Sequence, residues 1–190
     1  MRKIVLYTLM SLDGDVDDPS QYFTPEERPG LPPAFDQVMD DNEAAITATQ
    51  DAVLLGRHMY DEWSRYWPKV TEEPFVVFAD FINNVKKYVL TSTPLASEWN
   101  NSEAVSGPVE DVVRDLKSQP GGDIGVHGSI ELAQSLLAAG LVDELQLVLG
   151  PAVGFSGRRL FTSLGDIRRL ELLSAKPTPT GSVIVAYRVP

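Results

Sequence analysis

The residues best suited to chemistry lie where predicted strands run into predicted helices. In the segment LLGRHM, a strand ends at Gly56, and Arg57 and His58 begin the next helix. The free N–H groups of a helix's first turn, together with a guanidinium, can bind an anion such as a phosphate. The alternative is an ordinary strand–helix turn with a solvated arginine, because Gly-Arg alone is a weak motif.

A second junction repeats this plan in the segment VHGSI, where Gly128 and Ser129 follow a strand and Ile130 opens a helix. The N–H groups of residues 128–130 could hold a pyrophosphate. The glycine could equally serve close packing of the helix on the sheet. Gly122, Gly125 and Gly128 are three residues apart throughout, so they do not form the G-x-G-x-x-G fingerprint.

A third segment places hydroxyl groups at a strand end, at Thr91, Ser92 and Thr93. Hydroxyls there can bind a phosphate or a ribose, or they can simply lead into the turn at Pro94. Ligands of open α/β sheets bind beyond the carboxyl ends of the strands, so the three segments together predict one anion-binding crevice.

Other patterns are weaker. Asp13, Asp15 and Asp17 have the spacing of a calcium loop, but Asp18 stands at the sixth position and Thr24 at the twelfth, which argues against calcium. Only two histidines occur, far apart in sequence, so no metal site is expected. The aromatic residues of segment 60–67 are interpreted as packing, with ring stacking on a ligand as the alternative: Tyr60, Trp63, Tyr66 and Trp67.

Hydrophobic periodicity indicates strands alternating with helices. Strands are predicted at residues 3–9, 52–55, 86–91, 123–126 and 144–149, and helices at 34–49, 57–66, 108–119 and 129–139. Residues 75–85 are predicted as a short strand and a helical turn, and residues 24–33 as an irregular surface loop. Residues 170–174 and 182–189 are predicted as a closing hairpin. This order predicts an α/β fold with a mostly parallel sheet covered by helices.

Composition narrows the functional classes. The chain has 190 residues, of which 43% are hydrophobic and 23% charged, so we expect a single domain over residues 1–190. The absence of cysteine excludes disulfides, thiol nucleophiles and iron–sulfur clusters. A net charge of −11 argues against nucleic acid and anionic membranes as partners. Without a signal-peptide pattern or a long apolar run, a cytoplasmic protein is expected.

Several segments, in this order, resemble the dihydrofolate reductase-like superfamily, and most closely the C-terminal reductase domain of the bacterial riboflavin-biosynthesis deaminase–reductase. They are LMSLDG at 9–14, LLGRHMY at 54–60, YVLTS at 88–92, VHGS at 126–129 and GLVDEL at 140–145. The resemblance implies a dihydrofolate reductase-like three-layer fold: a central, mostly parallel mixed sheet flanked by helices, with an antiparallel C-terminal hairpin. It also implies a homodimer.

The resemblance further implies NADPH as cofactor. It assigns cofactor binding to three sets of residues: Gly56, Arg57 and His58; Thr91, Ser92 and Thr93; and Gly128, Ser129 and Ile130. Asp13 becomes a candidate substrate contact. Two features depart from dihydrofolate reductases: Met59 stands where many have threonine, and none of the three acids on the predicted first helix (Asp36, Asp40 and Glu43) can be singled out as the substrate-binding acid.

We therefore expect an NADPH-dependent oxidoreductase that transfers hydride to a small heterocyclic substrate, similar to 5-amino-6-(5-phosphoribosylamino)uracil reductase or dihydrofolate reductase. The sequence names no catalytic residue. Two alternatives stay open: a nucleotide- or ligand-binding homodimeric module without turnover, and a mainly structural homodimer.

Overall fold

The centre of the molecule is an eight-stranded sheet in the order β4-β3-β2-β5-β1-β6-β8-β7. The structure, a computed structural model, describes residues 1–23, 36–154, 156–162 and 167–190. The strands are β1 (Ile4–Ser11), β2 (Gln50–Gly56), β3 (Lys86–Leu90), β4 (Ser102–Val105), β5 (Asp123–His127), β6 (Glu144–Gly150), β7 (Glu171–Pro177) and β8 (Val183–Arg188). The helices are α1 (Pro19–Phe23), α2 (Gln37–Thr47), α3 (Arg57–Tyr66), α4 (Val76–Asn84), α5 (Val109–Ser118) and α6 (Ile130–Ala138), with a 3₁₀ turn at Trp67–Lys69.

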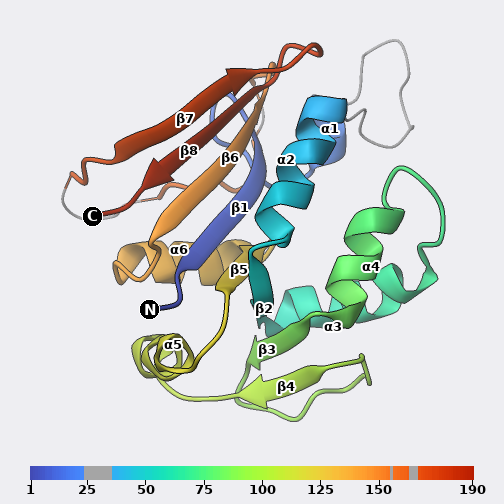
Figure 1. Ribbon diagram of the computed structural model, residues 1–190, viewed down its shortest axis with the longest axis vertical. Helices are drawn as coiled ribbons and strands as arrows, with labels where there is room; N and C mark the ends of the chain where they lie inside the picture. Colours follow the sequence, from blue (N-terminus) through green and yellow to red (C-terminus); the bar gives the residue numbers. More distant parts are fainter. Residues whose placement is uncertain (24–35, 155, 163–166) are drawn as a thin grey trace.

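The strands confirm the predicted mixed sheet. Every neighbouring pair from β4 to β6 is parallel. The last two strands reverse direction: β8 is antiparallel to β6, and β7 to β8. Figure 1 shows this closing hairpin in red at one end of the sheet. Parallel strands need helical crossovers, and these crossovers supply the covering layers.

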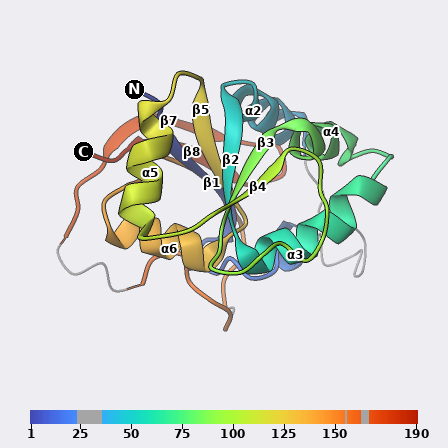
Figure 2. The same cartoon turned by 90° about the horizontal axis from the view of Figure 1, so that it is seen from below.

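Alternating side chains of the strands divide the core into two faces. In β1, Ile4 and Leu6 pack toward α5 and α6, whereas Val5 and Tyr7 pack toward α1 and α2. Figure 2 shows α5 and α6 on one side of the sheet and α2, α3 and α4 on the other. Fully burying one such aliphatic side chain contributes about 1.5–3 kcal/mol to the free energy of unfolding, so both helical layers are held mainly by apolar contact.

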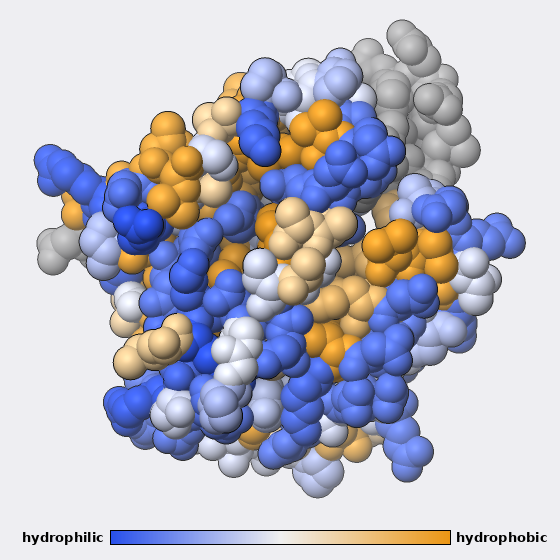
Figure 3. All heavy atoms as spheres, viewed as in Figure 1, coloured by the Kyte–Doolittle hydropathy of each residue, from blue (hydrophilic) through white to orange (hydrophobic). Residues whose placement is uncertain are grey.

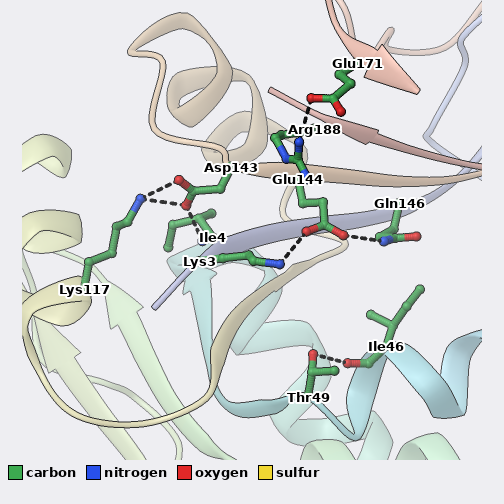
Figure 4. Close-up of polar contacts among 10 residues, drawn as sticks. All are labelled: Lys3, Ile4, Ile46, Thr49, Lys117, Asp143, Glu144, Gln146, Glu171 and Arg188. Carbon is green, nitrogen blue, oxygen red and sulfur yellow. Dashed lines mark hydrogen bonds and ion pairs between the residues drawn. The ribbon is translucent and has the colours of Figure 1, made fainter. Parts of the chain in front are cut away.

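At the amino ends of the strands, charged groups connect neighbouring elements. The carboxylate of Asp143 accepts hydrogen bonds from the N–H of Ile4 at 2.7 Å and from Lys117 Nζ at 2.6 and 2.8 Å. Lys3 Nζ lies 2.9 Å from the carboxylate of Glu144. These contacts join β1, α5 and the start of β6 (Figure 4).

One local prediction was wrong, and two short elements were not predicted. Residues 75–85 contain no strand: Val76–Asn84 is one helix, α4, because Phe78 and Ile82 lie one turn apart and both are buried. Strand β4 was not predicted, since its sequence SEAV is polar and it lies at the edge of the sheet beside β3. The short helix α1 was also missed. The loop predicted at 24–33 lies outside the described residues.

Among the described residues, no helix combines the length and the apolar character that a membrane crossing requires.

Candidate active site

A cleft of about 1090 Å³ opens where the parallel strands end. Its walls come from both faces of the sheet and include Tyr7 of β1, Glu43 of α2, Arg57 of α3, Phe78 of α4 and Ile130 of α6. Because parallel strands all finish at one edge, segments far apart in the sequence meet there. Side chains from these elements can therefore act on one ligand.

Two of the three predicted strand ends, the β2–α3 and β5–α6 junctions, border this cleft, and the third, after β3, is joined to them through Arg57. The N–H of Gly56 donates to Ser129 Oγ at 3.0 Å, which joins the β2–α3 junction to the β5–α6 junction. Arg57 Nη1 donates to Thr93 Oγ1 and to the carbonyl of Pro94, both at 2.8 Å, which joins the segment after β3. The predicted residues that border the cleft are Gly56, Arg57, His58, Gly128, Ser129 and Ile130. Thr91, Ser92 and Thr93 are not among the described residues that border it, and Thr93 is linked to it through Arg57.

Arg57, the first residue of α3, places a guanidinium at the N-terminus of this helix. Its Nε lies 2.7 Å from the carboxylate of Asp61, one helical turn further on. Together with the bonds to Thr93 and Pro94, this contact sets the direction of the side chain. The three bonds use planar, directional donors that also suit a phosphate group. The position matches the role expected for Arg57, which stays a prediction.

Gly128 allows the chain to turn tightly into α6. Its φ is +66°, and a Cβ at this position would lie 2.7 Å from the ring of Trp63 and 3.0 Å from the terminal carbon of Met59. Only glycine meets both conditions. The first helical bond of α6 runs from the N–H of Ala133 to the carbonyl of Ser129, so the N–H groups before it have no partner within the helix. The N–H of Ser129 donates to the carbonyl of His127 at 2.7 Å, so the N–H groups that remain for an anion are those of residues 130–132.

Glu43 of α2 is one of several acids that border the cleft, and it is the one whose pKa is raised. Burial raises the pKa of its carboxyl to about 7, and the nearby charge of Asp40 adds to the shift. Asp36 has a different task, because it caps α2 through the N–H of Met39 at 3.1 Å and accepts from Thr180 Oγ1 at 2.7 Å. The sequence placed three acids on one helix, and the tertiary structure brings Glu43 to the cleft.

Aromatic rings line the same half of the cleft. The ring centroids of Trp67 and Phe78 are 4.9 Å apart, and Phe78 and Tyr7 lie 5.6 and 5.7 Å from the ring of His127. The cluster interpreted as packing is divided: Trp63 and Trp67 border the cleft, whereas Tyr60 is fully buried and donates its hydroxyl to the carbonyl of Ser97 at 2.6 Å. Such walls favour a flat ligand.

Two buried polar atoms in this half have no hydrogen-bond partner among the described residues, Trp67 Nε1 and His127 Nδ1. Burial lowers the pKa of His127 to about 4, so the imidazole is neutral at neutral pH. Sequence reasoning considered His127 only as a metal ligand. The alternation of DIGVH, which directs Gly125 and His127 to the same face, was the available signal.

Asp13, the predicted substrate contact, takes part in the loop that follows β1. Its carboxylate accepts from Ser11 Oγ at 2.6 Å and from the N–H of Gly154 at 3.1 Å, and it lies 3.3 Å from Arg159 Nη2. Asp13 does not appear among the described residues that border the cleft. Its role in substrate binding stays a prediction, one that this geometry does not favour.

Comparison with known proteins agrees with this arrangement. Residues 2–184 match the RibD C-terminal domain family. The chain belongs to this family. This RibD C-terminal domain is also 30% identical over 139 residues to the uncharacterized protein YyaP of Bacillus subtilis, a match that spans 72% of the chain and 73% of the relative.

Solved structures share the fold. A riboflavin biosynthesis protein from Shewanella sp. PV-4 matches with a TM-score of 0.76 at 16% identity, over 99% of each chain. The deaminase/5-amino-6-(5-phosphoribosylamino)uracil reductase of Thermotoga maritima matches with a TM-score of 0.65 at 14% identity, over all of this chain and 57% of the other. Dihydrofolate reductase from Enterococcus faecalis, complexed with NADP(H), matches with a TM-score of 0.61 at 15% identity, over 98% and 96%. The RibD C-terminal domain therefore has a dihydrofolate reductase-like fold.

Proposed function

We propose that this protein is an NADPH-dependent reductase that transfers hydride to a small, planar nitrogen heterocycle. The observation that carries the proposal is a cleft that joins the β2–α3 and β5–α6 junctions, with the segment after β3 bonded to Arg57, and that Glu43 and aromatic rings also line. The substrate class follows the names of the Thermotoga and Enterococcus enzymes that share the fold, 5-amino-6-(5-phosphoribosylamino)uracil reductase and dihydrofolate reductase.

The part of the cleft formed by the β2–α3 and β5–α6 junctions, called the cofactor half below, fits a dinucleotide. The first N–H groups of α6 would bind the pyrophosphate, and Gly128 makes room for the side chains of Trp63 and Met59 at the turn before them. Arg57, with the hydroxyls of Thr91, Ser92 and Thr93 beside it, would bind the additional phosphate that distinguishes NADPH from NADH. When bound, the cofactor supplies the hydride; the side chains of this half hold and orient it.

The part of the cleft near Glu43, Phe78 and Trp67, called the substrate half below, fits the heterocycle. Trp67 and Phe78 would lie against the ring and exclude water. Reduction of a C=N or C=C bond needs a proton as well as a hydride, and Glu43 is the acid in this half. A carboxyl with a pKa of about 7 is half protonated at neutral pH, where a general acid works best. We assign the proton to Glu43.

A binding test examines the cofactor half. Protein fluorescence, titrated with NADPH and with NADH, should show tighter binding of NADPH. Arg57→Ala should weaken NADPH binding by about tenfold or more and NADH binding much less, because one charge-assisted phosphate contact is lost. Arg65→Ala, an exposed arginine on the same helix, is the matched control. Equal affinity for both nucleotides, or an unchanged Arg57→Ala variant, contradicts the assignment.

A turnover test separates the reductase from the alternative, a nucleotide-binding module. Oxidation of NADPH is followed by absorbance in the presence of pterins and of aminopyrimidines that carry ribosyl or ribityl groups. Turnover with any of them, reduced about 100-fold in Glu43→Gln, supports the reductase. Tight NADPH binding without turnover across the panel favours the binding module.

We also propose a homodimer that uses the β7–β8 end of the sheet. β7 is the last strand, and its side chains are exposed along its whole length. Leu170, Leu172, Leu173 and Val183 are exposed apolar residues of this region. Figure 3 shows apolar surface over this end of the molecule, at upper left. Sedimentation velocity should give a dimer that Leu172→Lys dissociates; a wild-type monomer contradicts this.

A further inference from the structure

His127 has a fixed hydrogen-bond arrangement inside the substrate half of the cleft. Its Nε2 lies 2.8 Å from Oε1 of Gln50, and both side chains are buried. With the amide of Gln50 in this orientation, its oxygen accepts and Nε2 carries the hydrogen, while the amide nitrogen of Gln50 has no partner among the described residues. A neutral imidazole has a single N–H, so Nδ1 presents a free lone pair.

That lone pair has no hydrogen-bond donor in the part of the chain that the structure describes. Nδ1 is buried and has no partner among the described residues, although it belongs to a residue that borders the cleft. The imidazole packs against the rings of Tyr7 and Phe78 at 5.7 and 5.6 Å. Leaving a buried acceptor without a donor costs about 1–3 kcal/mol. A ligand in the cleft with an N–H group directed at Nδ1 would remove that cost.

Gly125 makes room for the bond between Gln50 and His127. Residues 125 and 127 alternate with 124 and 126 in β5, so they share the face that α4 covers. A Cβ on Gly125 would lie 2.1 Å from Gln50 Oε1 and 2.6 Å from His127 Nε2. The glycine therefore lets the Gln50 side chain cross the sheet surface and reach the ring.

We propose that His127 determines substrate specificity by accepting a hydrogen bond, at Nδ1, from a ring N–H or amino group of the heterocycle. Gln50 is the positioning residue that keeps His127 in the required tautomer. This inference rests on the proposed function, because it assigns the substrate half of the same cleft. It selects planar nitrogen heterocycles that present a donor and rejects analogues in which that donor is methylated.

The tautomer is tested by NMR of protein labelled with ¹⁵N-histidine. The chain has two histidines, so the signals that disappear in His127→Phe are those of His127. We expect His127 to show an Nε2-protonated, neutral ring between about pH 5.5 and pH 8. A hydrogen on Nδ1, which the opposite orientation of the Gln50 amide would produce, overturns the inference.

Specificity is tested with lumazine, whose only donors are two ring N–H groups, and with 1,3-dimethyllumazine, which has none. Each is titrated by NMR with and without NADPH. Lumazine should bind at least about tenfold more tightly and should shift the Nδ1 resonance, because one buried hydrogen bond is gained. His127→Phe should abolish the preference while NADPH affinity stays within about twofold. Equal binding of the two compounds, or no lumazine binding by protein that binds NADPH, overturns the inference and leaves the proposed function standing.

Two further variants test the positioning role. Gln50→Leu removes the acceptor, so His127 should become a mixture of tautomers and the preference for lumazine should fall. Gln50→Glu keeps an oxygen acceptor, so the hydrogen on Nε2 should be retained, which a merely structural role of Gln50 would not require. An unchanged tautomer in Gln50→Leu overturns the role of Gln50. If NADPH fails to bind, the proposed function fails, and the NADPH-free titrations still decide the role of His127.

Discussion

The two ends of the parallel strands are built differently. At the amino ends, charged side chains find partners within the protein: Asp143 binds Ile4 and Lys117, and Arg2 binds Asp51 and the carbonyl of Gly122. At the carboxyl ends, His127 Nδ1 and Trp67 Nε1 are buried without partners among the described residues. The ion pairs at the amino end thus stabilise the fold, whereas His127 and Trp67, which border the cleft, keep polar atoms that a ligand could satisfy.

The acids of the two ends differ in the same way. At the carboxyl end, burial raises the pKa of Glu43 to about 7, which disfavours the charged form. At the amino end, Asp51 pairs with the guanidinium of Arg2, and the side chain of Arg2 is only 4% exposed. A paired charge supports folding, and an isolated buried acid opposes it above its pKa. The comparison predicts opposite effects for removing each carboxylate.

The largest effect is expected at the amino end. Asp51→Ala leaves the buried guanidinium of Arg2 without its carboxylate and removes the acceptor of the Gly122 N–H, which lies 2.8 Å away. We expect a loss of about 2–4 kcal/mol in the free energy of unfolding, measured by urea denaturation. Asp111→Ala, which removes an exposed pair with Arg114, is the control and should cost under about 0.5 kcal/mol. Equal losses of stability in the two variants would show that the Arg2–Asp51 pair contributes no more than the exposed Arg114–Asp111 pair.

Next in size is Gly125→Ala, near the carboxyl end. The new methyl group would displace Gln50 from His127, because its carbon would lie 2.1 Å from Gln50 Oε1, far below van der Waals contact. We expect a loss of about 1–3 kcal/mol in urea denaturation, together with a change of the His127 tautomer. Gly56→Ala is the control, since a Cβ there would meet only ordinary contacts at 3.8 Å or more. A stable variant with an unchanged tautomer would show that the glycine is not needed for the bond.

Glu43→Gln should stabilise the protein, but only at high pH. The folded-state pKa of about 7 lies above the ordinary value of 4.5, so the wild type loses stability as the pH rises through 7. The neutral amide avoids that loss. We expect the variant to be about 1–2 kcal/mol more stable near pH 8, after allowing for partial exposure, and equal to wild type near pH 5. Thermal unfolding at both pH values measures this; a variant that is less stable near pH 8 would contradict the comparison.

The smallest effect is expected from Lys117→Met at the amino end. Its ammonium group binds Asp143, but that carboxylate also accepts from the N–H of Ile4 and keeps a partner in the variant. The loss should be under about 1 kcal/mol in urea denaturation. A larger loss would mean that Lys117, rather than the main chain, is the principal partner of Asp143.

Much of the fold could be predicted because its signals are local. Apolar runs marked β1, β2, β5 and β6, and helical spacing marked α3, which spans Arg57–Tyr66 as predicted. The elements that were not predicted correctly, β4 and α4, also have a physical explanation. The polar strand β4 is held by pairing with β3, and a window of sequence contains no information about its partner. In α4, apolar residues outnumber polar ones, so helix and strand periods could not be told apart.

In the candidate site, too, the features with a local sequence signal could be predicted, and those that depend on packing could not. Glycines next to Arg57 and Ser129 marked the junctions, because tight strand–helix turns need particular residues. The choice of Glu43 among three helical acids and the pairing of Gln50 with His127 were not predictable, since each depends on packing between distant segments.

By itself, the sequence determined the alternation of strands and helices, the family and the three junctions, because periodicity and turn chemistry act over a few neighbouring residues. Only the tertiary structure decided which polar groups are buried together at the strand ends. Burial sets the charge of Glu43 and the neutral state of His127, and burial is a property of the packed molecule as a whole.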